Sequence, residues 1–195
     1  DMRFYTERCE AMRNFANKIW NASRFVMMNL TIDKCELPAA DALAPEDKWV
    51  LSKLNTLVKE VTENLDAYEI GVASAKVYDF LWDTYCDWYI ELTKTRLQGE
   101  DEGAKLAAQN VLCFVLTELL KLLHPFMPFI TEEIYQALPH EEQFIMTSRW
   151  PEYRADLAFP EEEAAMEAVM DTIKAIRARR AEMNVPPSRK AEVLI

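Results

Sequence analysis

The sequence predicts an all-α protein, a helical bundle of five or six helices with a short terminal strand at the C-terminal end. Along most of the chain, apolar side chains recur at steps of three and four residues, which is the spacing of one face of a helix. The chain has 195 residues, half of them apolar and 11% aromatic, which suffices for the core of one domain. Helices that each carry one apolar face pack together into a bundle.

The first three helices are predicted over residues 3–30, 45–66 and 69–97. In the first of them, Phe15 and Ile19 are two of the apolar residues that share one face. Pro45 opens the second helix, at the position where a first-turn proline is tolerated. The third helix should be buried because of its aromatic side chains. These aromatic residues include Tyr78, Trp82, Tyr85 and Tyr89.

The central helix is predicted over residues 104–124, because this segment is apolar almost all round. Two prolines then turn the chain, and a further helix starts at Pro128. After an irregular stretch, the last helix runs from Pro160 to about Asn184, with glutamates in its first turn and arginines near its end. The tail at 191–195, "AEVLI", gives the predicted strand.

Composition argues against several classes of function. Only three glycines occur, so no glycine-rich loop is available to bind a nucleotide phosphate, and no cofactor is expected in this chain. The net charge of −11, from 33 acidic and 22 basic residues, argues against loose, sequence-blind binding to nucleic acid, and no DNA partner is expected. No apolar run reaches about 18 residues and no signal peptide opens the chain, so we expect a cytoplasmic protein without a membrane partner.

Residue types that carry chemistry do not combine into a predicted catalytic or metal site. Asp79, Asp83 and Asp87 follow four-residue steps, but a carboxylate metal cluster in a bundle would also need Glu-x-x-His pairs. His124 and His140 have no nucleophile and orienting group near them in sequence. Four cysteines without a CxxC pair predict buried, reduced thiols. They are Cys9, Cys35, Cys86 and Cys113.

One side of the first predicted helix carries a polar ridge, formed by Arg13, Asn17, Asn21 and Arg24. At 100° per residue these four fall within an arc of about 80°, away from the apolar face. The arginines could pair with acids on a neighbouring helix, for which the three aspartates are candidates, while the asparagines face water. Alternatively, guanidinium and amide groups can donate and accept hydrogen bonds along the edge of an unpaired base.

A second basic group lies near the end of the chain. Residues 174–190 hold six basic side chains and one acid, a local charge of +5 in an acidic protein. Such a group could compensate the negative end of the last helix, or it could contact phosphates.

The segment "EAMRNFANKIWNASRFVMMNL" resembles the first helix after the catalytic domain of bacterial-type valyl-tRNA synthetases, a class I family. The resemblance covers nearly the whole chain, since "KWVLSKLNTLV", "YDFLWDTYCDWYIELTK", "LLHPFMPFITEEIYQALP", "SRWPEY" and "IRARRAEMNVPPSRKAEV" follow in the family's order. The proline-rich element is shared by related synthetases. The assignment to valine depends on "RNFANKIWNASRF" and "EMNVPPSRK", and an isoleucyl, leucyl or methionyl relative is the alternative within the class.

The resemblance implies that residues 1–184 are an anticodon-binding bundle and that 185–195 begin a truncated C-terminal junction. The family's nucleotide motifs, His-x-Gly-His and Lys-Met-Ser-Lys-Ser, are absent from this chain. The resemblance also implies that the partners are the anticodon stem-loop of valine tRNA and the catalytic domain of the same parent chain. That parent enzyme would use ATP and magnesium to attach valine, whereas this chain would only bind. A helical protein-interaction module is the rival class.

The residues expected to contact tRNA form three groups. The polar ridge supplies the leading base readers, and neighbours on the same helix supply stacking or phosphate contacts. The end of the last helix supplies phosphate contacts without base preference. The full set is Arg13, Asn17, Lys18, Asn21, Arg24, Phe25, Met28, Arg177, Arg180, Arg189 and Lys190.

Overall fold

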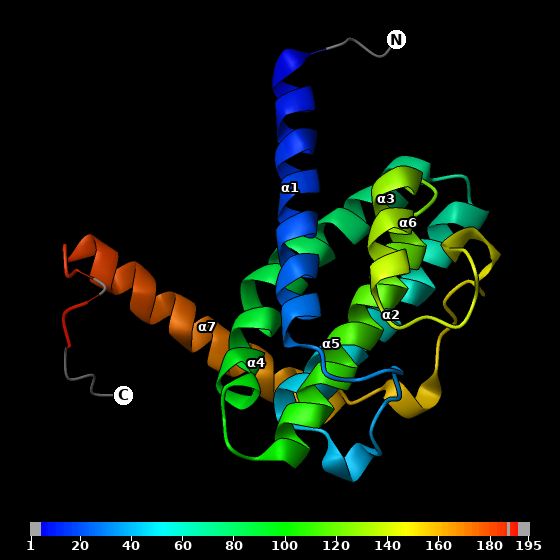
Figure 1. The fold of residues 1–195 in the computed structure, drawn as a ribbon. Helices are drawn as coiled ribbons and strands as arrows, with labels where there is room; N and C mark the ends of the chain where they lie inside the picture. The colour runs from blue at the N-terminus through cyan, green and yellow to red at the C-terminus, as the bar shows by residue number, and fades with distance from the viewer. Residues whose placement is uncertain (1–4, 187, 191–195) are drawn as a thin grey trace.

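The structure, a computed structural model, describes residues 5–186 and 188–190, and is 74% helical (Figure 1). No strand occurs among the described residues, and the predicted all-α class is confirmed. The predicted terminal strand at 191–195 lies outside the described residues.

The helices occur where the apolar periodicity predicts them, with ends displaced by a few residues. They are α1 (Thr6–Asn29), α2 (Pro45–Asp66), α3 (Ile70–Asp79), the π-helical segment η2 (Phe80–Tyr89), α4 (Ile90–Leu97), α5 (Glu102–Leu123), α6 (Pro128–Ala137) and α7 (Pro160–Glu182). Short 3-10 turns lie between them at Ala40–Ala42 (η1), Ile145–Thr147 (η3) and Ala155–Leu157 (η4). The last two interrupt the stretch before α7 that we expected to be irregular.

Helix α5 is the centre of the bundle, as its apolar character predicts. It packs against α1, α2, α3, α4 and α6, and Leu112, Leu116 and Leu119 are fully buried. By length and composition alone α5 could also cross a membrane, but 72% of its most apolar window is buried inside the bundle. Burial of this kind is what the core helix of a bundle requires.

The predicted helix over 69–97 is divided, because its middle part, η2, adopts the wider π-helical turn. A π-helix bonds residue i to residue i+5, and apolar residues three to five apart fit either repeat. Sequence periodicity therefore did not separate η2 from its α-helical neighbours. Within η2, Tyr85 and Tyr89 are completely buried, whereas Trp82 and Trp88 are only partly buried.

A buried polar network joins the start of α2 to the end of α4. The Asp47 carboxylate is inaccessible to solvent and accepts two hydrogen bonds from the Arg96 guanidinium, at 2.6 and 2.7 Å. It also accepts from Tyr89 Oη at 2.6 Å and from the backbone N–H of Ala44 at 3.1 Å. Because a buried carboxylate is costly without partners, these four donors explain how Asp47 is tolerated in the core.

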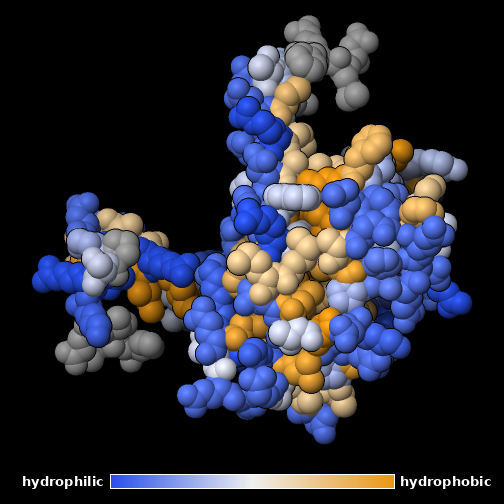
Figure 2. Space-filling view, viewed as in Figure 1, coloured by the Kyte–Doolittle hydropathy of each residue, from blue (hydrophilic) through white to orange (hydrophobic). Residues whose placement is uncertain are grey.

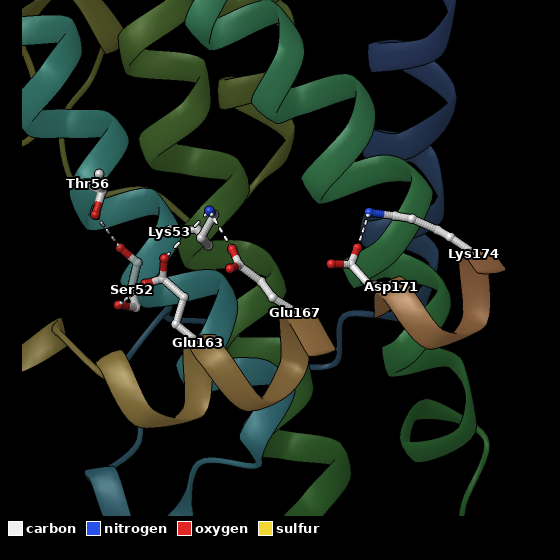
Figure 3. Close-up of polar contacts among 7 residues, drawn as sticks. All are labelled: Ser52, Lys53, Thr56, Glu163, Glu167, Asp171 and Lys174. Carbon is white, nitrogen blue, oxygen red and sulfur yellow. Dashed lines mark hydrogen bonds and ion pairs between the residues drawn. The ribbon is translucent and has the colours of Figure 1, made fainter. Parts of the chain in front are cut away.

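Helix α7 is attached to the bundle mainly through its first half. Lys53 Nζ lies 3.6 Å from Glu163 Oε1 and 2.9 Å from Glu167 Oε1, and Ser52 Oγ donates to Glu163 at 2.7 Å (Figure 3). Beyond this region α7 projects away from the other helices (Figure 1). Among its described residues, Met170 is the one that is buried, at 7% exposure.

The four cysteines are free thiols, but they are not all buried. Cys113 is buried and Cys35 and Cys86 are half-buried, whereas Cys9 is exposed near the start of α1. The prediction of buried thiols is therefore wrong for Cys9. The first turns of α1 extend beyond the body of the bundle (Figure 1), so an apolar position there has little to pack against.

Candidate nucleic-acid interface

All four side chains of the polar ridge are exposed on α1. Phe15, Ile19 and Val26 are buried on the other side of the same helix. Amphipathic periodicity thus explains why the ridge faces outward, since the apolar side chains fix the rotation of α1 against the core. In Figure 2 the outer side of α1 is mostly hydrophilic in its upper part, and apolar atoms appear toward its lower end.

Lys18, rather than an arginine, connects α1 to the aspartates of η2. Its Nζ lies 2.7 Å from Asp87 Oδ1 and 3.8 Å from the centroid of the Trp82 ring. Neither Arg13 nor Arg24 lies within 4.0 Å of a carboxylate among the residues that the structure describes. Within the described residues, Arg13 and Arg24 therefore do not pair with the aspartates. The guanidinium groups of both arginines face solvent.

The other expected contacts on α1 differ in accessibility. Met28 is 79% exposed, whereas Phe25 is partly buried against the core. Lys94 Nζ lies 5.6 Å from the centroid of the Phe25 ring. The side chain of Met28 is accessible to a ligand. Only part of the Phe25 ring is accessible, and the Lys18 ammonium is paired with Asp87. The tRNA contacts of all three residues stay predictions.

Trp20 is an exposed residue beside the ridge, and it is not among the contacts expected from the sequence. Its side chain is 41% exposed, and it lies three residues after Asn17 and four before Arg24. Positions three and four apart are neighbours on a helix surface, so the indole adjoins the ridge. The helical angle of Trp20 is the sequence signal that places this apolar side chain beside the polar ridge.

The basic residues at the end of α7 have different local partners. Arg179 pairs with Glu182 at 2.9 Å, and Lys174 pairs with Asp171 at 3.1 Å. Arg180 donates from Nη2 to the carbonyl oxygens of Pro186 and Arg189, at 2.8 and 2.7 Å. Arg180 thus holds the turn after α7, where Asn184 has a φ of 53°. The phosphate contact expected of Arg180 stays a prediction.

Arg177 lies against a tryptophan of η2. Its guanidinium carbon is 5.7 Å from the centroid of the Trp88 ring, and it has no carboxylate within 4.0 Å among the described residues. Arg189 and Lys190 are exposed beyond the helix. These three residues are therefore the cations of α7 and the segment after it that are most available to a polyanion.

No cluster of three or more His, Cys, Asp or Glu side chains suited to a metal ion occurs among the described residues. A hollow of about 760 Å³ lies away from the ridge, between the loop at 33–36, α5 and the segment 139–149. Its lining combines Lys121 and Arg149 with Glu118 and other acids, so it does not offer a site of single charge.

The exposed arginine and asparagine side chains, accompanied by accessible aromatic rings and unpaired cations, form a surface suited to single-stranded RNA. Residues 47–195 match the family described as the anticodon-binding domain of tRNA ligases. The chain belongs to this family. Helix α1, which carries the polar ridge, lies before the matched region.

The whole chain, α1 included, is also similar to valine–tRNA ligases. It is 56% identical over its full length to the enzyme of Clostridium tetani, 50% to that of Carboxydothermus hydrogenoformans and 47% to that of Bacillus anthracis. The chain spans 22% of the length of each of these relatives.

Proposed function

We propose that this chain binds the anticodon stem-loop of valine tRNA, as the anticodon-binding part of a valine–tRNA ligase. The observation that carries this proposal is the 56% identity to a valine–tRNA ligase over the full chain. The exposed ridge on α1 supports it, because arginine and asparagine side chains can recognise the edges of splayed loop bases. Arg13, Asn17, Asn21 and Arg24 are the proposed base readers.

The remaining contacts are proposed to hold the strand rather than to read it. Phe25 and Met28, with Lys18 beside them, would stack on loop bases or approach phosphates. Arg177, Arg180, Arg189 and Lys190 would contact phosphates without base preference. Because the whole chain carries a charge of −11, binding would depend on these local groups instead of a general attraction.

The chemistry of valine attachment would belong to the longer parent protein. A catalytic part of that protein would use ATP and magnesium, and the present chain would position the tRNA for it in the cytoplasm. We assign residues 1–184 to the anticodon-binding bundle and 185–195 to the start of a junction with a further segment.

A binding measurement tests the proposal. The purified chain is titrated with the anticodon stem-loop of valine tRNA and with the same stem-loop carrying another anticodon, at one salt concentration. We expect tighter binding to the valine anticodon. Equal binding to both would contradict the proposal, and preference for an isoleucine, leucine or methionine anticodon would assign the chain to a related ligase. Failure to bind either would favour a protein-interaction module.

The chain alone should not catalyse valine-dependent exchange between ATP and pyrophosphate, because it has no nucleotide motif. Measurable exchange above the blank without protein would contradict the assignment of this chain to binding only.

A further inference from the structure

Trp88 lies beside two cations of α7 that come from a distant part of the sequence. Its ring centroid is 5.7 Å from the Arg177 guanidinium carbon and 5.9 Å from Lys174 Nζ. Both distances fall within the roughly 6 Å range of a cation–π contact. The contact therefore places an aromatic ring of η2 directly beside the basic half of α7.

The polar edge of the Trp88 indole is also available. Trp150 donates its indole N–H to Thr62 Oγ1 at 2.9 Å, but Trp88 Nε1 donates to no described residue. It is not one of the buried nitrogen atoms that lack a partner, as Trp49 Nε1 is. The N–H of Trp88 therefore faces a region that solvent or a ligand can reach.

The two cations beside the ring have no strong ion pair with another described residue. Arg177 has no carboxylate within 4.0 Å among the described residues. Lys174 pairs with Asp171, but the two side chains are 57% and 75% exposed. An ion pair that is so exposed is weak, and a phosphate group can replace Asp171 as the partner of Lys174.

The position of Trp88 connects α1 with the basic half of α7. The residue before it, Asp87, pairs with Lys18 of α1, while Trp88 itself contacts Arg177 of α7. Consecutive residues of η2 thus contact α1 and α7. In Figure 1 the free ends of α1 and α7 point away from one another.

We propose that Trp88, Lys174 and Arg177 form a second RNA-binding site, which holds one nucleotide of the RNA that the ridge on α1 reads. The base stacks on the exposed part of the Trp88 indole, and the cations bind its phosphate. This inference rests on the proposed function. Stacking tolerates any base, so the site contributes affinity without reading sequence.

A structural role is the competing explanation, because the same contacts could serve only to hold the projecting half of α7 against η2. The two explanations differ in what a substitution changes. If the contacts only hold α7 against η2, their loss would lower the melting temperature. If they form an RNA site, their loss would lower the affinity for RNA in a protein that melts at the wild-type temperature.

The test uses Trp88→Ala, Trp88→Phe and Arg177→Gln, with Arg179→Gln as the matched control. Arg179 is also an exposed arginine of α7, but it is paired with Glu182 and contacts no tryptophan in the described structure. Each variant is titrated with the two anticodon stem-loops over a series of salt concentrations, and thermal melts are recorded in parallel.

We expect Trp88→Ala to weaken binding to both stem-loops by about tenfold or more, with their ratio unchanged, because stacking carries no base preference. Trp88→Phe should recover most of the affinity. Arg177→Gln should reduce the slope of log affinity against log salt by about one, and Arg179→Gln should change it less.

Binding of Trp88→Ala and Arg177→Gln at the wild-type level would overturn the second site. The second site would also be overturned if affinity for RNA fell only in those variants whose melting temperature falls as well. If Trp88→Ala does not fold, Trp88→Phe and Arg177→Gln still decide. If the wild type prefers the valine anticodon and these variants bind with unchanged affinity, the second site alone is refuted. Weakened binding without any wild-type preference would support the site and refute the proposed function, and absence of wild-type binding would refute both.

Discussion

Lys18 of α1 and Asp87 of η2 form an ion pair whose Nζ and Oδ1 atoms are 2.7 Å apart, with the ammonium 3.8 Å from the Trp82 ring centroid. At 100° per residue, Lys18 lies on the flank of α1, about 100° from the centre of the polar ridge. The ridge is therefore turned away from the aspartates of η2. This orientation leaves Arg13 and Arg24 exposed and available to a ligand.

Removal of the Lys18 contact should cost little stability. Asp87 is 52% exposed and stays hydrated when its partner is lost, so Lys18→Met should lower the free energy of unfolding by no more than about 1 kcal/mol. Arg13→Ala should change it less, because Arg13 has no described acidic partner. Urea unfolding of the two variants measures this, and a larger loss for Arg13→Ala would contradict the orientation of the ridge.

Removal of the buried Asp47 carboxylate should have a much larger effect. Asp47→Ala removes the fully buried carboxylate partner of Arg96, whose Nε keeps only Glu46 Oε1 at 3.0 Å, and loss of one member of a buried pair costs about 3 to 5 kcal/mol. The control is Glu91→Gln, which breaks an exposed pair with Lys94 and should cost about 1 kcal/mol or less. Denaturant unfolding compares the two, and equal losses would contradict the importance of the network.

Stability should fall in alkaline solution because of the buried tyrosines. Burial raises the pKa of Tyr85 and of Tyr89 well above the usual value. Nearby thiols add to the rise in pKa for Tyr85, and Asp47 adds to it for Tyr89 while Arg96 opposes it. Each contribution to stability is complete below the unfolded pKa of about 10 and is lost as pH rises towards the folded pKa, because only the unfolded chain ionises in between.

We therefore expect the urea midpoint of the wild type to fall between pH 9 and pH 11, a window set around the ordinary tyrosine pKa of about 10. Tyr85→Phe should start lower, since the Leu112 carbonyl loses its buried donor, but it should decline less steeply. The same slope in both proteins would show that Tyr85 is not responsible.

The thiols should react in the order of their accessibility. Cys9 is exposed and should react first with a disulfide reagent at pH 8, and buried Cys113 should react late. Burial raises the pKa of Cys86 to about 12, and the nearby Asp87 adds to the rise while Lys18 opposes it. Cys86 should therefore react slowly, because the thiolate is the reactive form. In urea all four should react quickly, and fast labelling of Cys86 in the native protein would contradict its placement.

The periodic part of this fold could be predicted from sequence, and the irregular part could not. Phe15, Ile19 and Val26 follow a helical repeat, so both α1 and its outward face are recognisable without a structure. The π-helical turn of η2 gives no distinct repeat. The Asp47 network joins residues about 50 positions apart, and no local rule indicates such a pairing.

The same division applies to the candidate site. The exposure of the ridge follows from the helical angle alone, whereas Arg180 turns back to the carbonyls of Pro186 and Arg189 because of the chain path after α7. The neighbourhood of Trp88 and Arg177 depends on how α7 crosses the bundle, which no sequence pattern used here encodes.

The ridge on α1 is proposed to read the anticodon, and titration of Arg24→Ala measures whether it does. Wild type and variant are titrated with the valine anticodon stem-loop and a swapped-anticodon stem-loop at one stated salt concentration, with thermal melts in parallel. We predict an unchanged melting temperature, a loss of about 1 to 3 kcal/mol on the valine loop and a reduced preference between the loops. A variant that keeps the wild-type preference, whether or not it melts early, would contradict the claim.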